Sequence, residues 1–215
     1  MRNKLFAALT AGLLLCGVFT GCGKTTETTT SAGTAAQGEE EFPANAIVIT
    51  LHADAAPITC ENFEKLVNDG FYNGVGFHRV VDDFMAQGGD PTGTGMGGSD
   101  QNIKGEFASN GVQNPLSHKR GVVSMARSQE NDSASSQFFI CYTDCSFLDG
   151  NYAAFGEVTY GMDVVDDFLK VERVMGSDGA VSSPTKPITM QEVKMISDDA
   201  EGNHRVEIVM NDFLQ

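Results

Sequence analysis

The sequence predicts a mainly β domain, an antiparallel barrel or sandwich with two helices, and three observations support this prediction. Short runs rich in β-branched and aromatic residues outnumber the stretches with helical periodicity. These runs follow one another across turn residues, whereas parallel βαβ units would alternate regularly with helices. The chain has 215 residues, of which 41% are hydrophobic, and this is enough for one core. After its ends are trimmed, we expect a single domain of about 150 to 170 residues.

The start of the chain is expected to be a targeting segment. Arg2 and Lys4 precede an apolar run over residues 5–22 that is short and glycine-containing for a membrane span. The tripeptide Thr-Gly-Cys that ends at Cys22 resembles the processing site of bacterial lipoproteins. We therefore expect residues 1–21 to be a signal peptide and Cys22 to be lipidated. A plain transmembrane anchor is the alternative, and both interpretations place the domain outside the cytoplasm.

A tether is expected to follow. Residues 23–42 are rich in Thr, Ala, Gly and Glu and contain almost no large apolar side chain, so they cannot bury enough surface to fold. We assign residues 22–45 to the lipidated cysteine and its flexible tether, and residues 46–197 to the folded domain. Residues 198–215 are then a C-terminal extension.

The first strand and the first helix follow from short local signals. Residues 46–53, AIVITLHA, form a β-branched run that is typical of a strand. Residues 56–70 predict a helix, because Pro57 suits an early helical position and Gly70 suits a C-terminal stop.

A hairpin is expected over residues 77–91, FHRVVDDFMAQGGDP. If its turn is centred near Asp82, Arg79 pairs with Met85. Because alternate residues of a strand share a face, Arg79, Met85 and Gln87 are then expected to lie on one side of the sheet.

The rest of the chain predicts a long loop, further strands and a second helix. Residues 89–118 are mostly Gly, Asn, Ser and Pro, and such a long loop is rarely kept without a use. The expected strands are residues 120–127, 136–142, 151–158, 186–196 and 204–213, and the expected helix is residues 161–170.

Several function classes are disfavoured. A net charge of −15 argues against nucleic-acid binding, because few cations are present to replace phosphate counterions. Residues 93–98, GTGMGG, match a dinucleotide fingerprint, which needs a strand before it and a helix after it. Here Asp90-Pro91 precede the segment and polar residues follow it, so a flexible loop is expected. A Ser/His/Asp hydrolase would need a nucleophile elbow, which is absent from the sequence. The four scattered histidines are expected to be structural.

The domain is expected to contain three cysteines, Cys60, Cys141 and Cys145. Their odd number means that at least one is a free thiol or pairs with another molecule. No histidine cluster has ligand spacing, so a metal site is not expected. Buried thiols are the favoured interpretation, and a Cys141–Cys145 bridge is the alternative.

Arg79 is unusual because it lies within an apolar stretch. One interpretation is a salt bridge to Asp82, Asp83 or Glu106, which would add little stability on the surface. The other is a functional cation beside an apolar pocket. A guanidinium is always charged and presents a fork of donors, so it suits a substrate carbonyl or amide nitrogen.

Five stretches, in this order, resemble the signatures of cyclophilin-type peptidyl-prolyl isomerases: FHRVVDDFMAQGGDP, VVSMAR, SQFFI, FLDG and AAFGEV. The resemblance extends over about residues 46–196. It implies an eight-stranded antiparallel barrel capped by two helices, with an active groove on its outer surface. It also implies an enzyme that needs no cofactor and no metal, and that acts on proline-containing peptide segments.

The resemblance also implies site residues. Arg79 matches the catalytic arginine, and Gln87 matches the glutamine that binds the peptide backbone. Ala126 and Arg127 fall where the family has an Ala-Asn pair that contacts the residues before proline, so Arg127 is a departure. The remaining matches line the proline pocket or the groove and its rim: Phe84, Met85, Gln137, Phe139, Phe147, Leu148 and Tyr152. Phe147 and Tyr152 stand where many eukaryotic members have tryptophan and histidine.

Two further expectations concern the edge of the sheet and the biological role. The family's first strand should precede residues 46–53, but EEEFPAN has little strand character, so residues 204–213 are expected to fill that edge position. The leading functional hypothesis is a monomeric, membrane-anchored prolyl isomerase that assists the folding of exported proteins. A module that binds proline-containing segments without turnover is the alternative, and an adhesin or structural lipoprotein is a third.

Overall fold

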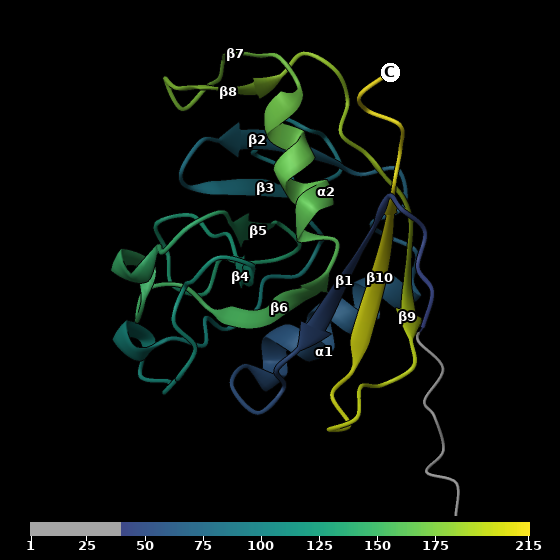
Figure 1. Ribbon diagram of the computed structural model, residues 1–215. Helices are drawn as coiled ribbons and strands as arrows, with labels where there is room; N and C mark the ends of the chain where they lie inside the picture. Colours follow the sequence, from purple (N-terminus) through teal and green to yellow (C-terminus); the bar gives the residue numbers. More distant parts are fainter. Residues whose placement is uncertain (1–39) are drawn as a thin grey trace, which may run out of the picture. The chain divides into compact units, whose positions relative to one another are not determined.

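Eight strands form one antiparallel sheet in the computed structural model, which describes residues 40–215 (Figure 1). Their order across the sheet is β2-β3-β5-β4-β6-β1-β10-β9. Their bounds are β1 Ala46–Leu51, β2 Gly76–Val81, β3 Met85–Asp90, β4 Val122–Met125, β5 Phe138–Cys141, β6 Ala154–Tyr160, β9 Met190–Ile196 and β10 Arg205–Met210. The predicted fold class is confirmed. The predicted signal peptide and Cys22 lie outside the described residues.

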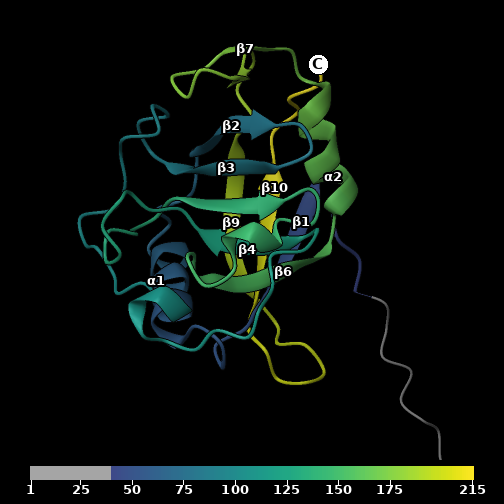
Figure 2. The same ribbon diagram turned by 90° about the vertical axis from the view of Figure 1, so that its left-hand side faces the viewer.

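The sheet curls strongly, so that β2 and β3 cross in front of β9 and β10 (Figure 2). Its two edge strands approach each other at an isolated bridge between Gly76 and Thr189. Side chains from the concave face fill the interior. Phe63 lies at its centre, with ring centroids 5.4 Å from Phe138 and 5.1 Å from Phe155.

Two helices complete the core. Helix α1, Pro57–Asn68, begins with the predicted proline and ends before Gly70, whose φ of 69° favours glycine. It packs against β9. Helix α2, Met162–Asp167, contacts β1 and continues as the 3-10 turn η3, Phe168–Lys170. No helix among residues 40–215 has both the length and the apolarity to cross a bilayer.

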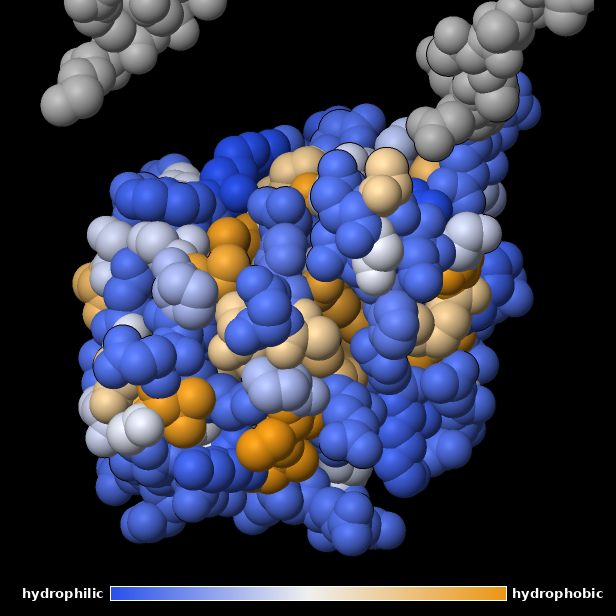
Figure 3. All heavy atoms as spheres, turned by 90° about the horizontal axis from the view of Figure 1, so that it is seen from below, coloured by the Kyte–Doolittle hydropathy of each residue, from blue (hydrophilic) through white to orange (hydrophobic). Residues whose placement is uncertain are grey.

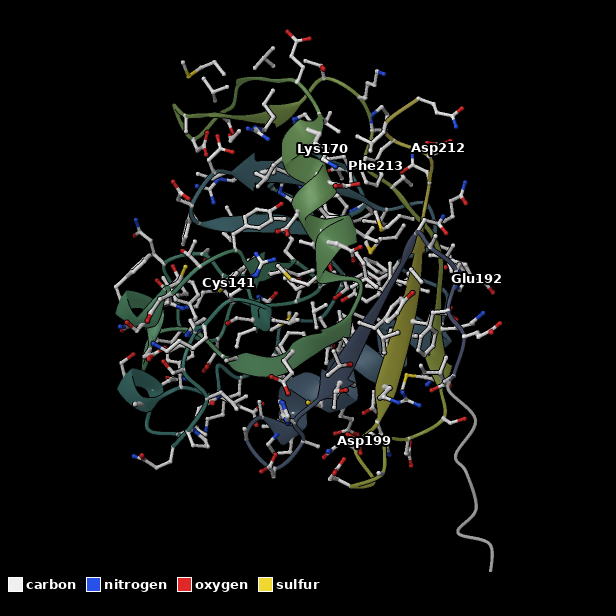
Figure 4. All side chains as sticks on the ribbon, in the orientation of Figure 1. Cys141, Lys170, Glu192, Asp199, Asp212 and Phe213 are labelled. Carbon is white, nitrogen blue, oxygen red and sulfur yellow. The ribbon has the colours of Figure 1, made fainter. Side chains whose placement is uncertain are left out.

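Strand β10 lies beside β1, with Ala46 opposite Val209 and Thr50 opposite Arg205. Strand β9 pairs along its other side, so β10 occupies an inner position rather than an edge. After β10, Phe213 packs on Phe168 of η3 with ring centroids 5.2 Å apart (Figure 4). The last part of the described chain therefore contributes to the core.

The predicted register of the β2–β3 hairpin is wrong by two residues. Arg79 pairs with Gln87, and Met85 pairs with Val81, because the turn is centred on Asp83 and not on Asp82. Asp83 has a φ of 56°, the left-handed conformation that closes this turn. A shift of two residues preserves the faces of both strands, so Arg79, Met85 and Gln87 still share one.

A second, two-stranded sheet was not predicted. It consists of β7, Arg173–Met175, and β8, Val181–Pro184, and it packs against β2. Two further elements are short, the 3-10 turns η1, Ala108–Asn110, and η2, Ser146–Leu148. The loop that joins β3 to η1 is long and spans residues 91–107. Seen from below, the surface is mostly hydrophilic, with separate apolar patches (Figure 3).

Candidate active site

The outer face of the sheet carries an apolar cluster that is separate from the main core. Its buried members are Met85, Phe139, Cys141, Cys145 and Leu148. Val81, Phe84, Ala126 and Tyr152 pack against them. A hollow of about 110 Å³ opens here, and its lining is Arg79, Phe84, Met85, Gln87, Ala126, Arg127, Phe139, Leu148 and Tyr152. A largely apolar hollow with two arginines in its wall is therefore present on the surface.

Sheet register places the polar and apolar parts of this hollow side by side. Arg79 of β2 lies opposite Gln87 of β3, and Gln87 lies opposite Phe139 of β5. These three residues form a row across neighbouring strands. Because side chains alternate between faces along each strand, Met85 also points to the outer side. Phe84 and Leu148 come from the β2–β3 turn and from η2.

Arg79 lies at the edge of the hollow, with 29% of its side chain exposed. Its Nη1 donates to Met85 Sδ at 3.6 Å and faces Gln87 Oε1 at 3.5 Å. Its Cζ lies 5.8 Å from the centre of the Phe84 ring. The salt bridge of Arg79 is made to Asp178 at 2.6 Å, and not to any of the three acids that the sequence suggested. The first interpretation is therefore wrong about the partner of Arg79, although an ion pair is present. Arg79 also borders the hollow, and its functional role stays a prediction.

The three suggested acids have other roles. Asp82 pairs with Arg173 at 2.9 Å. Glu106 is buried and caps α1, because its carboxylate accepts hydrogen bonds from the backbone N–H groups of Ile58 and Thr59. Asp83 forms the hairpin turn, and its carbonyl accepts a hydrogen bond from Thr143 Oγ1.

A larger and more polar hollow, of about 420 Å³, adjoins the apolar one. Gln87, Ala126 and Arg127 line both. Gln137 lies between them, because its Oε1 accepts a hydrogen bond from Gln87 Nε2 at 2.8 Å. A groove with one apolar and one polar section therefore runs past Gln87.

The loop after β3 forms one wall of the polar hollow, and Asp90 organises it. The carboxylate of Asp90 accepts hydrogen bonds from the backbone N–H groups of Thr92, Thr94, Gly95 and Gly97. Burial alone would raise the pKa of Asp90, but these hydrogen bonds outweigh burial and lower it to about 2. The GTGMGG segment is thus a loop of the groove, as predicted, and Asp90 fixes it. Strand β3 ends just before this loop, but the next element along the chain is the 3-10 turn η1 and not the helix that a dinucleotide site needs.

Comparison with known proteins identifies the family of the chain that carries this groove. The family model for cyclophilin type peptidyl-prolyl cis-trans isomerases matches residues 38–195. The chain belongs to this family. As a cyclophilin, it is an enzyme whose substrates are proline-containing peptides.

Cyclophilins from distant organisms resemble this chain over most of their length. It is 37% identical over 209 residues to peptidyl-prolyl cis-trans isomerase A of Dickeya dadantii, covering 91% of this chain and 99% of the relative. It is 43% identical over 137 residues to peptidyl-prolyl cis-trans isomerase B of Bacillus subtilis, covering 61% of this chain and 92% of the relative.

A solved cyclophilin structure is also similar. It is the Cryptosporidium parvum cyclophilin type isomerase, determined in the presence of the dipeptide Ala-Pro. The match has a TM-score of 0.58 and 30% identity, and it covers 68% of this chain and 89% of the other.

Arg127, the residue that the resemblance marks as a departure from asparagine, packs between two rings. Its Cζ lies 5.0 Å from the centre of the Phe107 ring and 4.9 Å from that of Tyr152. Its Nε donates to the carbonyl of Asn151 at 3.0 Å. Tyr152 in turn packs edge-on against Phe139, at 5.9 Å between centroids. Arg127 therefore forms part of the rim that holds Tyr152 and the pocket behind it.

The predicted site residues of this cyclophilin lie together. Nine of the predicted eleven line the apolar hollow; of the other two, Gln137 contacts Gln87, and Phe147 packs against Phe84 with centroids 5.7 Å apart. Phe147 is 69% exposed and forms the outer rim.

A Ser-His-Asp constellation lies beneath the cyclophilin groove. His118 Nε2 is 2.9 Å from Ser124 Oγ, and His118 Nδ1 is 2.7 Å from Asp149 Oδ1. Ser124 and His118 are buried, so no substrate reaches the hydroxyl. The His118 ring stacks on Phe139 at 6.0 Å and 15°. This histidine is structural, and it supports Phe139 in the wall of the apolar hollow.

Cys60, Cys141 and Cys145 are free and buried, as the favoured interpretation predicts. Burial raises the pKa of Cys60 to about 12 and also raises that of Cys141, which ends β5 (Figure 4). Such thiols are poor nucleophiles. Among residues 40–215, no cluster of three or more His, Cys, Asp or Glu side chains is placed to hold a metal ion.

Sequence reasoning missed Asp178 as the partner of Arg79. The Asp-Gly dipeptide at residues 178–179 is a turn signal. Nothing in the sequence relates that turn to an arginine 99 residues earlier.

Proposed function

We propose that this isomerase accelerates X–Pro rotation by using Arg79 to stabilise the twisted amide. The observation that supports this is the contact of the Arg79 guanidinium with Met85 and Gln87 at the wall of the apolar hollow. A cation that is always charged thus lies next to a pocket of the chemistry that a proline ring requires.

The chemistry follows from the electronic structure of the peptide bond. Resonance gives the C–N bond a rotation barrier of about 18–20 kcal/mol, so uncatalysed X–Pro exchange takes tens to hundreds of seconds. In the twisted transition state the proline nitrogen becomes pyramidal and regains a lone pair. A donor aimed at that nitrogen binds the twisted state better than either planar state, and this difference accelerates the reaction.

The other groove residues hold the substrate during rotation. Phe84, Met85, Phe139 and Leu148 would fix the proline ring, while Gln87 would hold the backbone next to it. Lowering the barrier by about 7 kcal/mol would give roughly a 10⁵-fold rate increase. No nucleophile, general base or cofactor is needed for this reaction.

Cis/trans exchange of an X–Pro peptide, measured by NMR with the wild type and Arg79→Ala, tests this mechanism. We expect Arg79→Ala to lower kcat at least about 100-fold, since it removes a donor used in the transition state, and to leave the peptide Kd within about threefold. Equal loss of turnover and binding would contradict a transition-state role. A folded wild type without any acceleration would favour the peptide-binding module, for which the Arg127–Tyr152 rim is the supporting observation.

The cellular context is a second part of the proposal. The apolar run that ends at Cys22 supports export, removal of residues 1–21 and lipid attachment at Cys22. The enzyme would then act as a monomer on exported proteins at the extracytoplasmic face of a membrane. Labelled fatty acid should be incorporated into the wild type and not into Cys22→Ala in a bacterial host. Labelling of both proteins, or of neither, would contradict this assignment.

A further inference from the structure

The turn between β7 and β8 is folded tightly around one carboxylate. Gly176 N donates to the carbonyl of Ala180 at 2.7 Å, and Gly179 has a φ of 76°. A Cβ on Gly176 would lie 2.4 Å from Ser182 Oγ and 2.8 Å from Asp178 Oδ1. The absence of a side chain at Gly176 therefore lets the turn close over Asp178.

The carboxylate of Asp178 is fixed on both oxygens. Oδ1 accepts hydrogen bonds from Ala180 N at 3.1 Å and from Ser182 Oγ at 2.8 Å. Oδ2 accepts one from Arg79 Nε at 2.6 Å. Burial opposes ionisation of Asp178, but the hydrogen bonds from Arg79, Ala180 and Ser182 outweigh it and lower the pKa to about 2. The ion pair is therefore intact at neutral pH.

This pair is better shielded than an ordinary surface salt bridge. Only 22% of the Asp178 side chain and 29% of the Arg79 side chain are exposed. A hydrogen bond between two charged groups is short and strong, and it fixes an orientation as well as a distance. Within residues 40–215, most other pairs of Lys or Arg with a carboxylate are more exposed, such as Lys65–Asp69 at 65% and 56%.

Holding Nε fixes the whole guanidinium, because that group is planar. With Nε on Asp178, Nη1 faces Met85 Sδ and Gln87 Oε1. Within residues 40–215, Nη2 has no hydrogen-bond partner, so it remains available to a substrate. Asp178 thus contacts the Nε edge of the guanidinium, which is turned away from Gln87. The two terminal nitrogens, Nη1 and Nη2, are left to face the groove.

We propose that Asp178 is a positioning residue for Arg79, which it holds in the orientation that donates to the proline amide. This inference rests on the proposed role of Arg79. It assigns a function to the β7–β8 hairpin, which supplies one side chain to a site otherwise built on the large sheet. Asp178 does not touch the substrate, and it acts only through Arg79.

The hairpin has an independent anchor, so changing Asp178 does not release it. Arg173, at the start of β7, donates from Nη2 to both carboxylate oxygens of Asp82, at 2.9 and 3.0 Å. Its Nη1 donates to the carbonyl of Leu169 at 2.9 Å. Asp178→Asn keeps the shape of the side chain and removes its charge, while Asp178→Ala also removes the acceptor. Asp69→Asn removes the same charge from an exposed pair with Lys65 and serves as the matched control.

The test compares kcat and KM for an X–Pro peptide, by NMR exchange at several peptide concentrations. For Asp178→Asn and Asp178→Ala we expect kcat to fall about tenfold, because a misplaced reacting group can cost up to about a hundredfold. KM should stay within about twofold, and Asp69→Asn should match the wild type. In an Arg79→Ala background, the same Asp178 changes should have no further effect. In the wild type, the NMR signal of the Arg79 Nε proton should be shifted from the position of a free arginine, and the proton should exchange slowly with water. In Asp178→Asn, both the position and the exchange rate should be those of a free arginine.

Several results would overturn the inference. One is an unchanged or increased kcat in both Asp178 variants, since an increase would make Asp178 an inhibitor of Arg79. Another is a loss that persists in the Arg79→Ala background, which would show that the effect does not pass through Arg79. If Arg79→Ala itself retains full kcat, the proposed mechanism fails and the positioning role fails with it. If Arg79→Ala is inactive while both Asp178 variants are normal, only the positioning role fails.

Discussion

Gln87 Nε2 donates a hydrogen bond to Gln137 Oε1 at 2.8 Å, and this contact joins the apolar and polar sections of the groove. Gln137 Nε2 continues the chain of contacts by donating to the carbonyls of Gly95 and Gly97, at 3.1 and 2.7 Å. One amide side chain therefore connects β3, β5 and the loop after β3. The same contact leaves Gln87 Oε1 facing Arg79.

Gln137→Ala should weaken substrate binding more than it slows rotation. It removes three hydrogen bonds that position Gln87 and the loop, and each contributes about 1 kcal/mol. We expect KM for an X–Pro peptide to rise roughly tenfold, with kcat within about twofold of the wild type. Gln191→Ala, on the exposed face of β9, is the matched control and should change neither parameter. A loss confined to kcat would show that Gln137 acts in the chemical step.

Asp90→Asn should loosen the loop that borders the polar hollow. A carboxylate accepts hydrogen bonds on both oxygens, whereas an amide would point an NH₂ group at backbone donors that need an acceptor. Unfolding by urea should show a loss of about 1–3 kcal/mol, the cost of leaving buried polar groups unpaired. Hydrogen exchange at Gly95 and Gly97 should become faster. Unaltered protection of these two amides would contradict the role of Asp90 as the organiser of the loop.

The pH dependence of stability should report the buried His118. Burial lowers the pKa of His118, and the nearby Asp149 only partly offsets that effect. In the unfolded chain a histidine has a pKa of about 6.5. Below that pH the unfolded chain binds more protons than the folded one, so stability falls as the pH falls from about 6.5 towards the folded pKa. The slope for this one group is at most about 1.4 kcal/mol per pH unit.

The contribution of His118 to the pH dependence of stability is obtained by comparing the wild type with a variant, because other histidines with shifted pKa values also contribute. Burial lowers the pKa of His78, whereas a hydrogen bond to Glu64 raises that of His204 and gives the opposite sign. Urea unfolding between pH 7.5 and 5 should therefore be compared for the wild type and His118→Gln. The variant should be less stable at pH 7.5 and less sensitive to acid. Parallel curves would mean that His118 does not resist protonation in the folded state.

Arg127 should stabilise the rim through its planar guanidinium and not through its charge alone. Stacking on two rings contributes about 0.5–2 kcal/mol, and a lysine in its place would lose both the plane and the hydrogen bond to Asn151. Arg127→Lys and Arg127→Ala should therefore lower thermal stability by similar amounts. Peptide titrations should show a several-fold weaker Kd in both. Full retention of stability and affinity by Arg127→Lys would indicate that the positive charge alone matters.

Local patterns predicted which residues share a face better than which residues touch. The shared outward face of Arg79, Met85 and Gln87 follows from a period of two, so this prediction survived a wrong hairpin register. The register itself depends on the left-handed Asp83, which neighbouring Asp-Asp residues do not reveal. The resemblance to cyclophilins supplied the roles of these residues, because no local pattern distinguishes a proline pocket from any other apolar hollow.

The pairing of β10 with β1 was predicted, but two other contacts between distant segments were not. Strand β7 has three residues, too few for a period to appear, so the hairpin that holds Asp178 went unnoticed. The stacking of Arg127 on Phe107 likewise depends on how the long loop folds back. Both interactions are decided by tertiary packing, and both involve charged groups whose partners lie far away in the chain.

The position of β10 between β1 and β9 also determines when this domain can fold during synthesis. Strand β1 is among the first parts of the described chain to leave the ribosome, yet one of its two neighbours is among the last. Pairing of segments far apart in the chain slows folding, because the entropy of loop closure is lost before the contacts form. Until residues 205–210 emerge, β1 has an unpaired side that can bind other extended chains. A nascent copy of this enzyme therefore exposes an open strand edge for most of its own synthesis.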